Sequence, residues 1–414
     1  MKSLYLYKSL EWDYIITEYY KSKAGEESDF LSGLFDFGRT FGMRGNLWKL
    51  YLTFLIVNDE NPYSLSCEGK DPGEDSLSET AKLDISYLLE LYNEDFSFFT
   101  DESDRRALEL AKDFSCSNSH LHMLSKRIRE EITKLSEEIA ASSGVDEAEP
   151  FIRRFYSRFG VGDIGLHRAF RLDEEGELIP VTNISHVSFD DLVGYDFQKK
   201  QLRDNTEQFL KGRPSNNVLL YGDAGTGKST SIKAMMGEYY EDGLRVIEVY
   251  KHQFKHLNAL ISQIKNRRYR FIIFMDDLSF EEFEIEYKYL KAVIEGGLEK
   301  KPENVLIYAT SNRRHLVKES FKDKGEILDD DLHKNDTVQE KLSLAYRFGV
   351  QIYFPSPEKR EFNNIVLELA KKEGLDMDEQ TLLLEANKWE LRGSGKSGRS
   401  ARQLIDNLLG KTGE

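Results

Sequence analysis

One glycine-rich turn constrains the fold of this chain more than any other feature of its sequence. The segment GDAGTGKS, residues 222–229, fits the pattern G-x-x-x-x-G-K-[ST], follows the apolar text NVLLY and opens the helical text KSTSIKAMMGEYY. Such a turn presents consecutive backbone N–H groups and a helix N-terminus to an anion, and its glycines allow it to wrap tightly. A chance glycine turn is the alternative, but it does not explain the flanking strand and helix. The sequence therefore predicts a phosphate-binding loop in an α/β fold.

The residues of this turn are expected to hold a nucleoside triphosphate and its magnesium ion. Lys228 would reach the β- and γ-phosphates, and the Ser229 hydroxyl would ligate Mg²⁺. The expected ATP-binding residues of the turn are Gly222, Asp223, Ala224, Gly225, Thr226, Gly227, Lys228, Ser229 and Thr230. The predicted cofactors are therefore ATP and Mg²⁺.

A second Gly-Lys-Ser triplet lies near the C-terminus, in GSGKSGRSARQ at residues 393–403, and it does not meet the same requirements. Glu390 occupies the place of the first glycine, and the preceding text EANKWELR is helical. A phosphate loop of this kind needs a strand before it. We therefore do not interpret this triplet as a second phosphate loop.

Short apolar runs alternate with helical text from residue 217 onward. They are NVLLYG, LRVIEVY, RFIIFMDD, NVLIYATSN and VQIYF. Near-continuous apolar runs are typical of parallel strands that are buried on both faces, and the helical text between them builds repeated β-α units. The predicted fold class is therefore α/β, with a parallel sheet flanked by helices.

Polar residues end two of these strands. Asp276 and Asp277 close RFIIFMDD, and Asn312 closes NVLIYATSN. Because the carboxyl ends of parallel strands meet at the edge where the phosphate turn lies, Asp276 is expected to hold Mg²⁺ and Asp277 to orient or deprotonate the attacking water. Asn312 would hold that water or the γ-phosphate. Many ATPases carry Glu at the second acidic position, so the shorter Asp277 predicts slower hydrolysis or assistance from Glu281 or Glu282.

The first 150 residues are expected to form a helical domain. Apolar residues recur every three or four positions from Leu121 to Ile139, which predicts an amphipathic helix that packs on its own domain or, alternatively, binds a partner as a coiled coil. Acidic text and Pro150 follow, and we place a domain boundary there. The segment FIRRFYSRFGVGDIGLHRAFR, residues 151–171, then interleaves five arginines with aromatic residues. It can bind nucleic acid by stacking and phosphate contacts or pack against a neighbouring domain.

Charge and cysteine content argue against several classes of protein. The chain has 57 Lys and Arg against 73 Asp and Glu, a formal charge of −16, which argues against a bulk attraction to nucleic acid or anionic membrane. Cys67 and Cys116 do not make a disulfide framework or a metal site. The longest apolar run, residues 47–57, is about half the length that a membrane span requires, and we identify no signal peptide. We expect a soluble cytoplasmic protein without a membrane span.

The order of the motifs resembles that of the AAA+ ATPases. Residues 151–409 are also similar to a bacterial family of single-module AAA+ ATPases that is catalogued as a domain of unknown function. The similarity lies in FDDLVGYDFQKKQL, NNVLLYGDAGTGKST, MDDLSF, LIYATSNRRHL, LSLAYRFGV and SGRSARQ. The resemblance implies a P-loop α/β core with an N-terminal helical domain and a small C-terminal helical lid. The expected divisions are 1–150 for the helical domain, 151–188 for a basic-aromatic linker, 189–355 for the core and 356–414 for the lid.

The resemblance also implies roles for residues outside the strands. The segment from Asp191 to Gly194 would flank the adenine pocket, with Val193 and Gly194 as contacts of the base. Arg402 would be the second sensor of the phosphate, with Arg399 next in line. An ordinary surface or ion-pair role is the alternative for Arg402.

The same resemblance makes Arg347, in the text YRFG, the candidate arginine finger and Asn312 the first sensor. An arginine finger stabilises charge that develops on the γ-phosphoryl oxygens and often comes from a neighbouring subunit, which predicts a homo-oligomer. Tyr346 stands where similar segments carry an acidic residue that could orient the arginine. Activation between subunits is therefore in question here, and an ion-pair role is the alternative for Arg347.

Two functions remain open. The first is an AAA+ ATPase that hydrolyses ATP to drive conformational work on an unidentified protein or nucleic-acid partner. The second is a slow nucleotide-gated switch or loader that controls assembly on DNA or on a protein, with residues 158–171 and 312–315 as its basic features. The order of sensor and lid disfavours a small-molecule kinase. The text NKWE at residues 387–390 is helical, which disfavours a GTPase.

Overall fold

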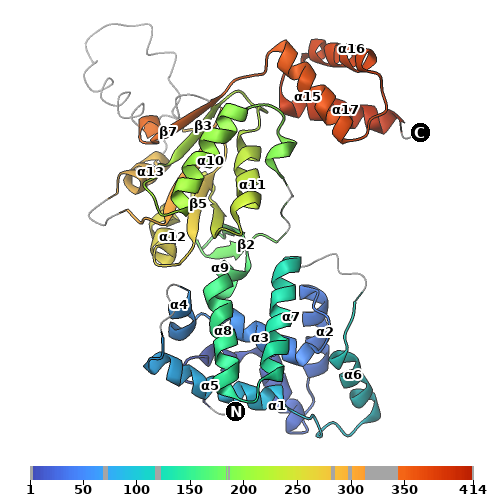
Figure 1. Cartoon of the computed structure of the whole chain (residues 1–414), viewed down its shortest axis with the longest axis vertical. Coiled ribbons are helices and arrows are strands. Elements are labelled where there is room, and N and C mark those ends of the chain that lie inside the picture. Colours follow the sequence, from blue (N-terminus) through green and yellow to red (C-terminus); the bar gives the residue numbers. More distant parts are fainter. Residues whose placement is uncertain are drawn as a thin grey trace. The chain divides into compact units, whose positions relative to one another are not determined.

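The computed structural model describes residues 3–68, 73–116, 123–182, 184, 187–280, 285–296, 301–312 and 344–412. The chain divides into two compact units, which we treat separately. One comprises Met1–Arg168 with Pro180–Asn183, and the other comprises Ala169–Ile179 with Ile184–Glu414. Figure 1 shows that the first unit is built from helices and that the second contains the sheet.

The helical unit is organised around one helix that is apolar on all sides. Its elements are η1 (Lys8–Trp12), α1 (Tyr14–Lys23), α2 (Phe30–Phe41), α3 (Leu47–Asn58), α4 (Pro62–Cys67), α5 (Ser76–Tyr92), α6 (Glu102–Lys112), α7 (Lys126–Ala141), α8 (Val145–Phe159) and α9 (Gly162–Leu166). Helix α3 begins at the N-cap Asn46, whose side chain accepts from the Lys49 N–H. A helix that is apolar all round is buried, and α3 accordingly lies in the core, against α2, α5, α7 and α8.

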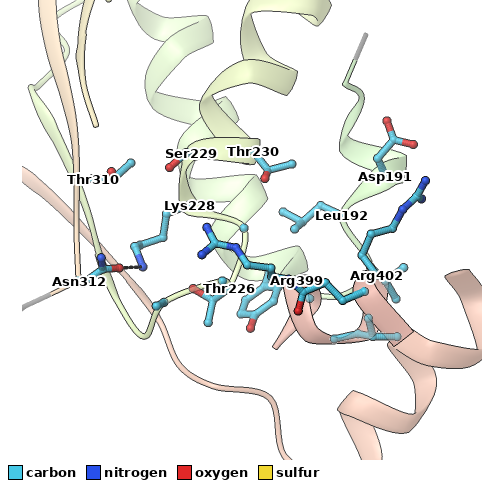
Figure 2. Close-up of a pocket in the computed structure, with 18 of the residues that line it drawn as sticks. Asp191, Leu192, Thr226, Lys228, Ser229, Thr230, Thr310, Asn312, Arg399 and Arg402 are labelled. Carbon is cyan, nitrogen blue, oxygen red and sulfur yellow. Dashed lines mark hydrogen bonds between the residues drawn. The ribbon is translucent and has the colours of Figure 1, made fainter. Parts of the chain in front are cut away.

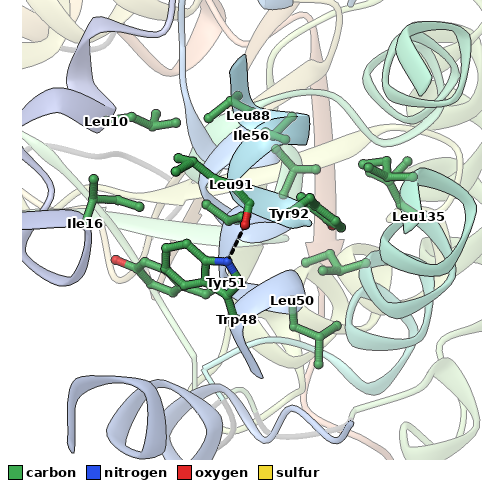
Figure 3. Close-up of a cluster of buried hydrophobic side chains, with 14 of the residues drawn as sticks. Leu10, Ile16, Trp48, Leu50, Tyr51, Ile56, Leu88, Leu91, Tyr92 and Leu135 are labelled. Carbon is green, nitrogen blue, oxygen red and sulfur yellow. Dashed lines mark hydrogen bonds between the residues drawn. The ribbon is translucent and has the colours of Figure 1, made fainter. Parts of the chain in front are cut away.

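Trp48 on α3 lies at the centre of this core. Its indole N–H donates to the Leu91 carbonyl oxygen on α5 at 2.7 Å, so the buried donor is satisfied (Figure 3). The same core contains the buried side chains of Leu10 on η1, Ile16 on α1, Leu88 and Tyr92 on α5 and Leu135 on α7, together with Ile56 on α3 itself. The stripe predicted on α7 packs into the same core, which supports packing on its own unit over a coiled coil.

The arginine-aromatic segment begins inside helix α8. Phe155, Tyr156 and Phe159 are buried in the helical core, so their rings are not available for stacking on bases. Three of its arginines form ion pairs, which are Arg153–Glu149, Arg154–Glu138 and Arg158–Glu131. The described structure therefore favours the packing interpretation of this segment over the nucleic-acid interpretation.

The boundary expected at Pro150 lies within α8, which begins at Val145. Ala148, Ile152 and Phe155 follow one another at helical spacing and are all buried, so packing continues the helix past the proline. The division by contacts falls after Arg168 instead.

The second unit contains a seven-stranded sheet in the order β2-β1-β4-β5-β6-β3-β7. Its elements are β1 (Ala169–Leu172), β2 (Leu178–Pro180), η2 (Phe189–Asp191), α10 (Asp196–Leu210), β3 (Val218–Gly222), α11 (Lys228–Tyr239), β4 (Leu244–Glu248), η3 (Lys251–His256), α12 (Leu257–Ile264), β5 (Arg270–Met275), α13 (Glu286–Glu295), β6 (Val305–Ser311) and β7 (Val350–Phe354). The five apolar runs form β3 to β7, and the pairs that join them are parallel. The fold is therefore α/β, with a parallel sheet and flanking helices (Figure 1).

Strand β6 lies between β5 and β3, so it adjoins both the strand of the acidic pair and the strand of the phosphate turn. Its buried Tyr308 hydroxyl is held by Asn205 at 2.9 Å and Thr206 at 2.7 Å, both on α10. Burial raises the pKa of Tyr308 to about 12. This polar contact, fully satisfied inside the core, docks α10 on the sheet.

The C-terminal lid consists of α15 (Lys359–Lys372), α16 (Glu379–Trp389), the short η5 (Glu390–Ser394) and α17 (Gly398–Thr412). It has its own hydrophobic core, in which Phe362, Val366, Ala386 and Ile405 are buried. The second Gly-Lys-Ser triplet lies between η5 and α17, with helical residues before it. It therefore lacks the strand that a phosphate loop requires.

We expect Leu52→Ala to lower the free energy of unfolding of the helical unit by about 2–5 kcal/mol, because Leu52 on α3 is fully buried and truncation leaves a cavity. Leu83→Ala, at a side chain that is 61% exposed, is the matched control and should change stability by no more than about 0.5 kcal/mol. Urea unfolding followed by tryptophan fluorescence measures both. Equal effects would contradict the central position of α3.

Candidate nucleotide-binding site

The turn between β3 and α11 can be built only with glycine at two of its positions. Gly222 has φ of 134°, and a Cβ there would lie 2.1 Å from the Phe354 carbonyl oxygen on β7. Gly227 has φ of 94°, and a Cβ there would lie 2.2 Å from the Leu192 side chain. The backbone conformation disfavours a side chain at both positions, and at Gly222 the Phe354 backbone also leaves no space for one. The motif is thus a tight bend packed between β7 and the segment that precedes α10.

Lys228 is buried at the start of α11, and its ammonium group is held by three oxygens. It donates to the carbonyl oxygens of Gly222 at 2.9 Å and Asp223 at 2.6 Å. It also donates to Asn312 Oδ1 at 3.0 Å (Figure 2). Burial lowers the pKa of Lys228, and the nearby carboxylates of Asp223 and Asp277 oppose that shift. A positive charge is therefore positioned at the mouth of the turn.

The residues predicted to hold magnesium contact each other directly. Ser229 Oγ donates to Asp276 Oδ1 at 2.5 Å. A hydroxyl and a carboxylate are oxygen donors of the kind Mg²⁺ prefers, and Mg²⁺ is usually bound by one or two such groups together with phosphates and waters. These two side chains fit that role. The described residues contain no cluster of three or more His, Cys, Asp or Glu side chains that could hold a metal ion by themselves.

Asn312 joins the second aspartate to the lysine. Its Nδ2 donates to Asp277 Oδ1 at 2.7 Å, while its Oδ1 accepts from Lys228. Asp277 has φ of 51°, an uncommon conformation for a residue that is not glycine. The structure therefore brings together the predicted side chains of the turn, the acidic pair and the first-sensor position.

Thr310 is a residue of this site that the sequence analysis missed. Its hydroxyl donates to Asp276 Oδ1 at 2.6 Å and accepts from the Asp277 N–H at 2.9 Å. Thr310 is on β6, two residues before Asn312, which directly follows the strand, and alternate residues of an extended chain face the same side. The spacing of two residues from Asn312 was therefore the sequence signal by which Thr310 could have been predicted as a site residue.

A cavity of about 640 Å³ lies over the turn, between the sheet and the lid. This volume is within the range of pockets that enclose small ligands. Its walls include Leu192, Val193, Ala224, Gly225, Thr226, Gly227, Lys228, Ser229, Thr230, Asp276, Asp277, Thr310, Asn312, Arg399 and Arg402. Gly194 lines an adjoining groove instead, and the backbone carbonyls of Gly222 and Asp223 serve to anchor Lys228.

The two candidate lid arginines differ in position. The Arg399 backbone N–H donates to the Gly225 carbonyl oxygen at 3.2 Å, so Arg399 lies directly on the turn. Arg402 pairs with Glu373 at 2.6 Å and with Asp406 at 3.3 Å. Both line the cavity (Figure 2). Arg399, which the resemblance ranks second, is the one in contact with the phosphate turn.

Two further contacts join the lid and its connecting segment to the turn and to the segment before α10. Asp223 Oδ2 accepts from the Ser356 N–H at 2.9 Å, in the segment between β7 and α15. Asp191, before α10, forms an ion pair with Lys372 on α15, and this contact lowers the pKa of Asp191. The position of the lid is thus tied to the turn and to the segment predicted to flank adenine.

Arg347 is not among the residues that line the cavity. It pairs with Glu295, the last residue of α13, and the adjacent Tyr346 is 73% exposed. Several other candidates lie outside the described residues, namely Glu281, Glu282, Arg313, Arg314 and His315. Within the part of the chain that is described, no helix is long and apolar enough to cross a membrane.

The sequence of this chain is similar to one family model and to two relatives of known name. The model of a family described as "Protein of unknown function (DUF815)" matches residues 165–412. The chain is 41% identical over 66 residues to the replication factor C large subunit of Staphylothermus marinus, covering 16% of this chain and 15% of that protein. It is 25% identical over 231 residues to the ATP-dependent zinc metalloprotease FtsH of Aquifex aeolicus, covering 52% of this chain and 35% of that protein. The chain thus spans about a seventh and about a third of these relatives.

Among solved structures, the chain is similar to RuvB, the Holliday junction branch migration motor of Thermotoga maritima. The identity is 17% and the TM-score is 0.36, over 53% of this chain and 63% of that one.

We expect Lys228→Ala to abolish binding of a fluorescent ATP analogue, because the variant loses the ammonium group that the turn holds at its mouth. Lys233→Ala, on the exposed face of the same helix, is the matched control and should bind as the wild type does. Fluorescence anisotropy titration measures both. Unchanged affinity in Lys228→Ala would refute the assignment of the site.

Proposed function

This chain belongs to the family described as "Protein of unknown function (DUF815)", within the AAA+ ATPase superfamily, and we propose that it binds ATP with Mg²⁺ at the β3–α11 turn and hydrolyses it. The observation that supports this most directly is the contact of Asn312 with both Lys228 and Asp277. It connects the expected phosphate-binding cation to the expected water-activating carboxylate. In this proposal, hydrolysis drives conformational work on an unidentified protein or nucleic-acid partner.

Each side chain of the site has a separate role in the proposed reaction. Lys228 and the backbone N–H groups of the turn bind the phosphates, and Ser229 and Asp276 hold the magnesium ion. Mg²⁺ neutralises charge on the β- and γ-phosphate oxygens when it is bound. Asp277 accepts a proton from the attacking water, and Asn312 orients both that carboxylate and Lys228.

The lid is the part through which the proposed work is done. It contacts the turn through Arg399 and Gly225, and its connecting segment contacts Asp223 through Ser356. Because the lid has its own hydrophobic core, it can move as one body when the contents of the cavity change. We propose that nucleotide binding and hydrolysis change its position.

Arg347 is proposed to act on the nucleotide of a neighbouring subunit. It lies on the segment before β7, does not line its own cavity, and pairs with Glu295 beside the exposed Tyr346. A homo-oligomer would bring this edge of one subunit to the cavity of the next. The pair with Glu295 must then open before Arg347 can contact the γ-phosphate.

A slow nucleotide-gated switch or loader is the second candidate. Two observations favour it over a fast motor. Asp277 is one methylene shorter than the glutamate of many ATPases, and Arg347 is engaged by Glu295. In this alternative, ATP binding controls assembly on DNA or on a protein, and turnover only resets the state.

The two functions are separated by steady-state Mg²⁺-ATP hydrolysis measured across a range of protein concentrations. We expect specific activity to rise with concentration, and Arg347→Ala to lower it by about 10³-fold, the scale of an arginine finger. Arg106→Ala, at an exposed arginine of the helical unit, is the matched control. ATP binding with negligible turnover at every concentration would contradict the motor and support the switch.

Mixing experiments complete this test. An equimolar mixture of Arg347→Ala and Lys228→Ala should regain activity, because an intact turn in one subunit then meets an intact arginine from the other. Glu295→Gln should lower the protein concentration at which activity appears, since it removes the charge that holds Arg347. Activity in mixtures no greater than the sum of the two variants would contradict action between subunits.

The lid arginines give a separate prediction. Arg399→Ala should raise the KM for ATP or lower kcat by about tenfold or more. The variant keeps the backbone N–H but loses the guanidinium group, which we propose bonds to a phosphate in the cavity that Arg399 lines. A hydrogen bond to a charged group contributes about 1.5–3 kcal/mol. Arg402→Ala should have the smaller effect, since its guanidinium is engaged by Glu373 and Asp406. Steady-state kinetics measures both variants. A larger loss in Arg402→Ala would restore the ranking implied by the family resemblance.

A further inference from the structure

We propose that Thr310 is a positioning residue for the acidic pair. It directs the Asp276 carboxylate toward the metal ion and the Asp277 carboxylate toward the attacking water. This inference rests on the proposed function. Thr310 is on β6, the strand between β5 and β3, and its side chain is 1% exposed. In the strand register it is opposite Leu220 of β3, while its neighbour Ala309 is opposite Met275 of β5. It therefore lies between the acidic pair and the phosphate turn.

Thr310 makes hydrogen bonds to three consecutive residues that follow β5. Its hydroxyl donates to Asp276 Oδ1 at 2.6 Å and accepts from the Asp277 N–H at 2.9 Å. Its carbonyl oxygen accepts from the Leu278 N–H at 2.7 Å. A hydroxyl has one hydrogen to donate and lone pairs to accept, so both of its functions are used here. Serine retains this ability, whereas valine and alanine lose it.

These bonds hold Asp277 in its left-handed conformation, with φ of 51°. Residues other than glycine adopt this conformation only where their surroundings hold them in it. The turn directs the two carboxylates to different partners. Asp276 contacts Ser229, and Asp277 contacts Asn312. The conformation therefore separates the metal-binding function from the water-activating function.

Asp276 Oδ1 accepts from two hydroxyls, those of Ser229 and Thr310, which lie next to each other in Figure 2. Ser229 is itself a proposed ligand of Mg²⁺, so its role changes when the ion binds. Thr310 is not a proposed ligand, and its hydroxyl continues to orient Asp276. Partners behind metal ligands typically change metal affinity 10- to 100-fold when they are removed.

The test measures nucleotide binding as a function of Mg²⁺ in Thr310→Val, with Thr310→Ser as the matched control. Binding of a fluorescent ATP analogue is titrated first in EDTA and then at increasing Mg²⁺. We expect Thr310→Val to raise the half-saturating Mg²⁺ concentration by about 10- to 100-fold. Affinity in EDTA should stay within about twofold of the wild type, because the hydroxyl contacts the carboxylates and not the phosphate turn. Thr310→Ser should restore most of the Mg²⁺ response.

Three results would overturn the inference, and they can be distinguished. An unchanged Mg²⁺ response in Thr310→Val would overturn it alone, as would equal losses of binding in EDTA and in Mg²⁺, which indicate a general structural role. Absence of nucleotide binding by the wild type would overturn the proposed function and this inference with it. If Thr310→Val does not fold, Thr310→Ala removes the same hydroxyl from a smaller side chain and must give the same shift.

Discussion

The contact of the Lys228 ammonium group with three oxygens is the interaction on which the site depends. A buried charge is unfavourable unless it is paired and hydrogen-bonded, and burial lowers the pKa of this lysine. Two of its acceptors belong to the turn itself, and the third is Asn312, directly after β6. The lysine therefore forms this set of bonds only when β3, α11 and β6 are in their places in the sheet. The same arrangement places Asp276 and Asp277 beside it.

The lid adds a second constraint on the same turn. Gly225 accepts from the Arg399 N–H, and Asp223 accepts from the Ser356 N–H. Gly222 lies so close to the Phe354 carbonyl oxygen that no side chain fits. The turn is thus packed on one side against the strand that leads to the lid and on another against the lid itself. These contacts tie the position of the lid to that of the turn.

Local sequence pattern was a reliable guide where function depends on residues close in the chain. The strands β3 to β7 were predicted because apolar runs of that length are buried in a parallel sheet, and the turn was predicted because it needs a strand before it and a helix after it. Strand β1 was missed because its four residues lie in text rich in arginine and aromatic side chains. In the same text, the sequence alone did not distinguish buried rings from exposed ones. Position 150 was taken as a boundary because an acidic run and Pro150 follow the amphipathic helix, but buried apolar side chains on both sides of the proline belong to one helix, α8.

The sequence by itself determined the α/β class, the phosphate turn and the order in which the acidic pair and Asn312 arrive at the edge of the sheet. Each of these follows from neighbouring residues or from the period of apolar side chains. Only the tertiary structure decided which atoms meet. Lys228 and Asn312 are 84 residues apart, and Thr310 and Asp276 are 34 apart. Strand pairing creates these contacts. Packing of the lid brings Arg399 to the turn, while Arg402 pairs with carboxylates of the lid.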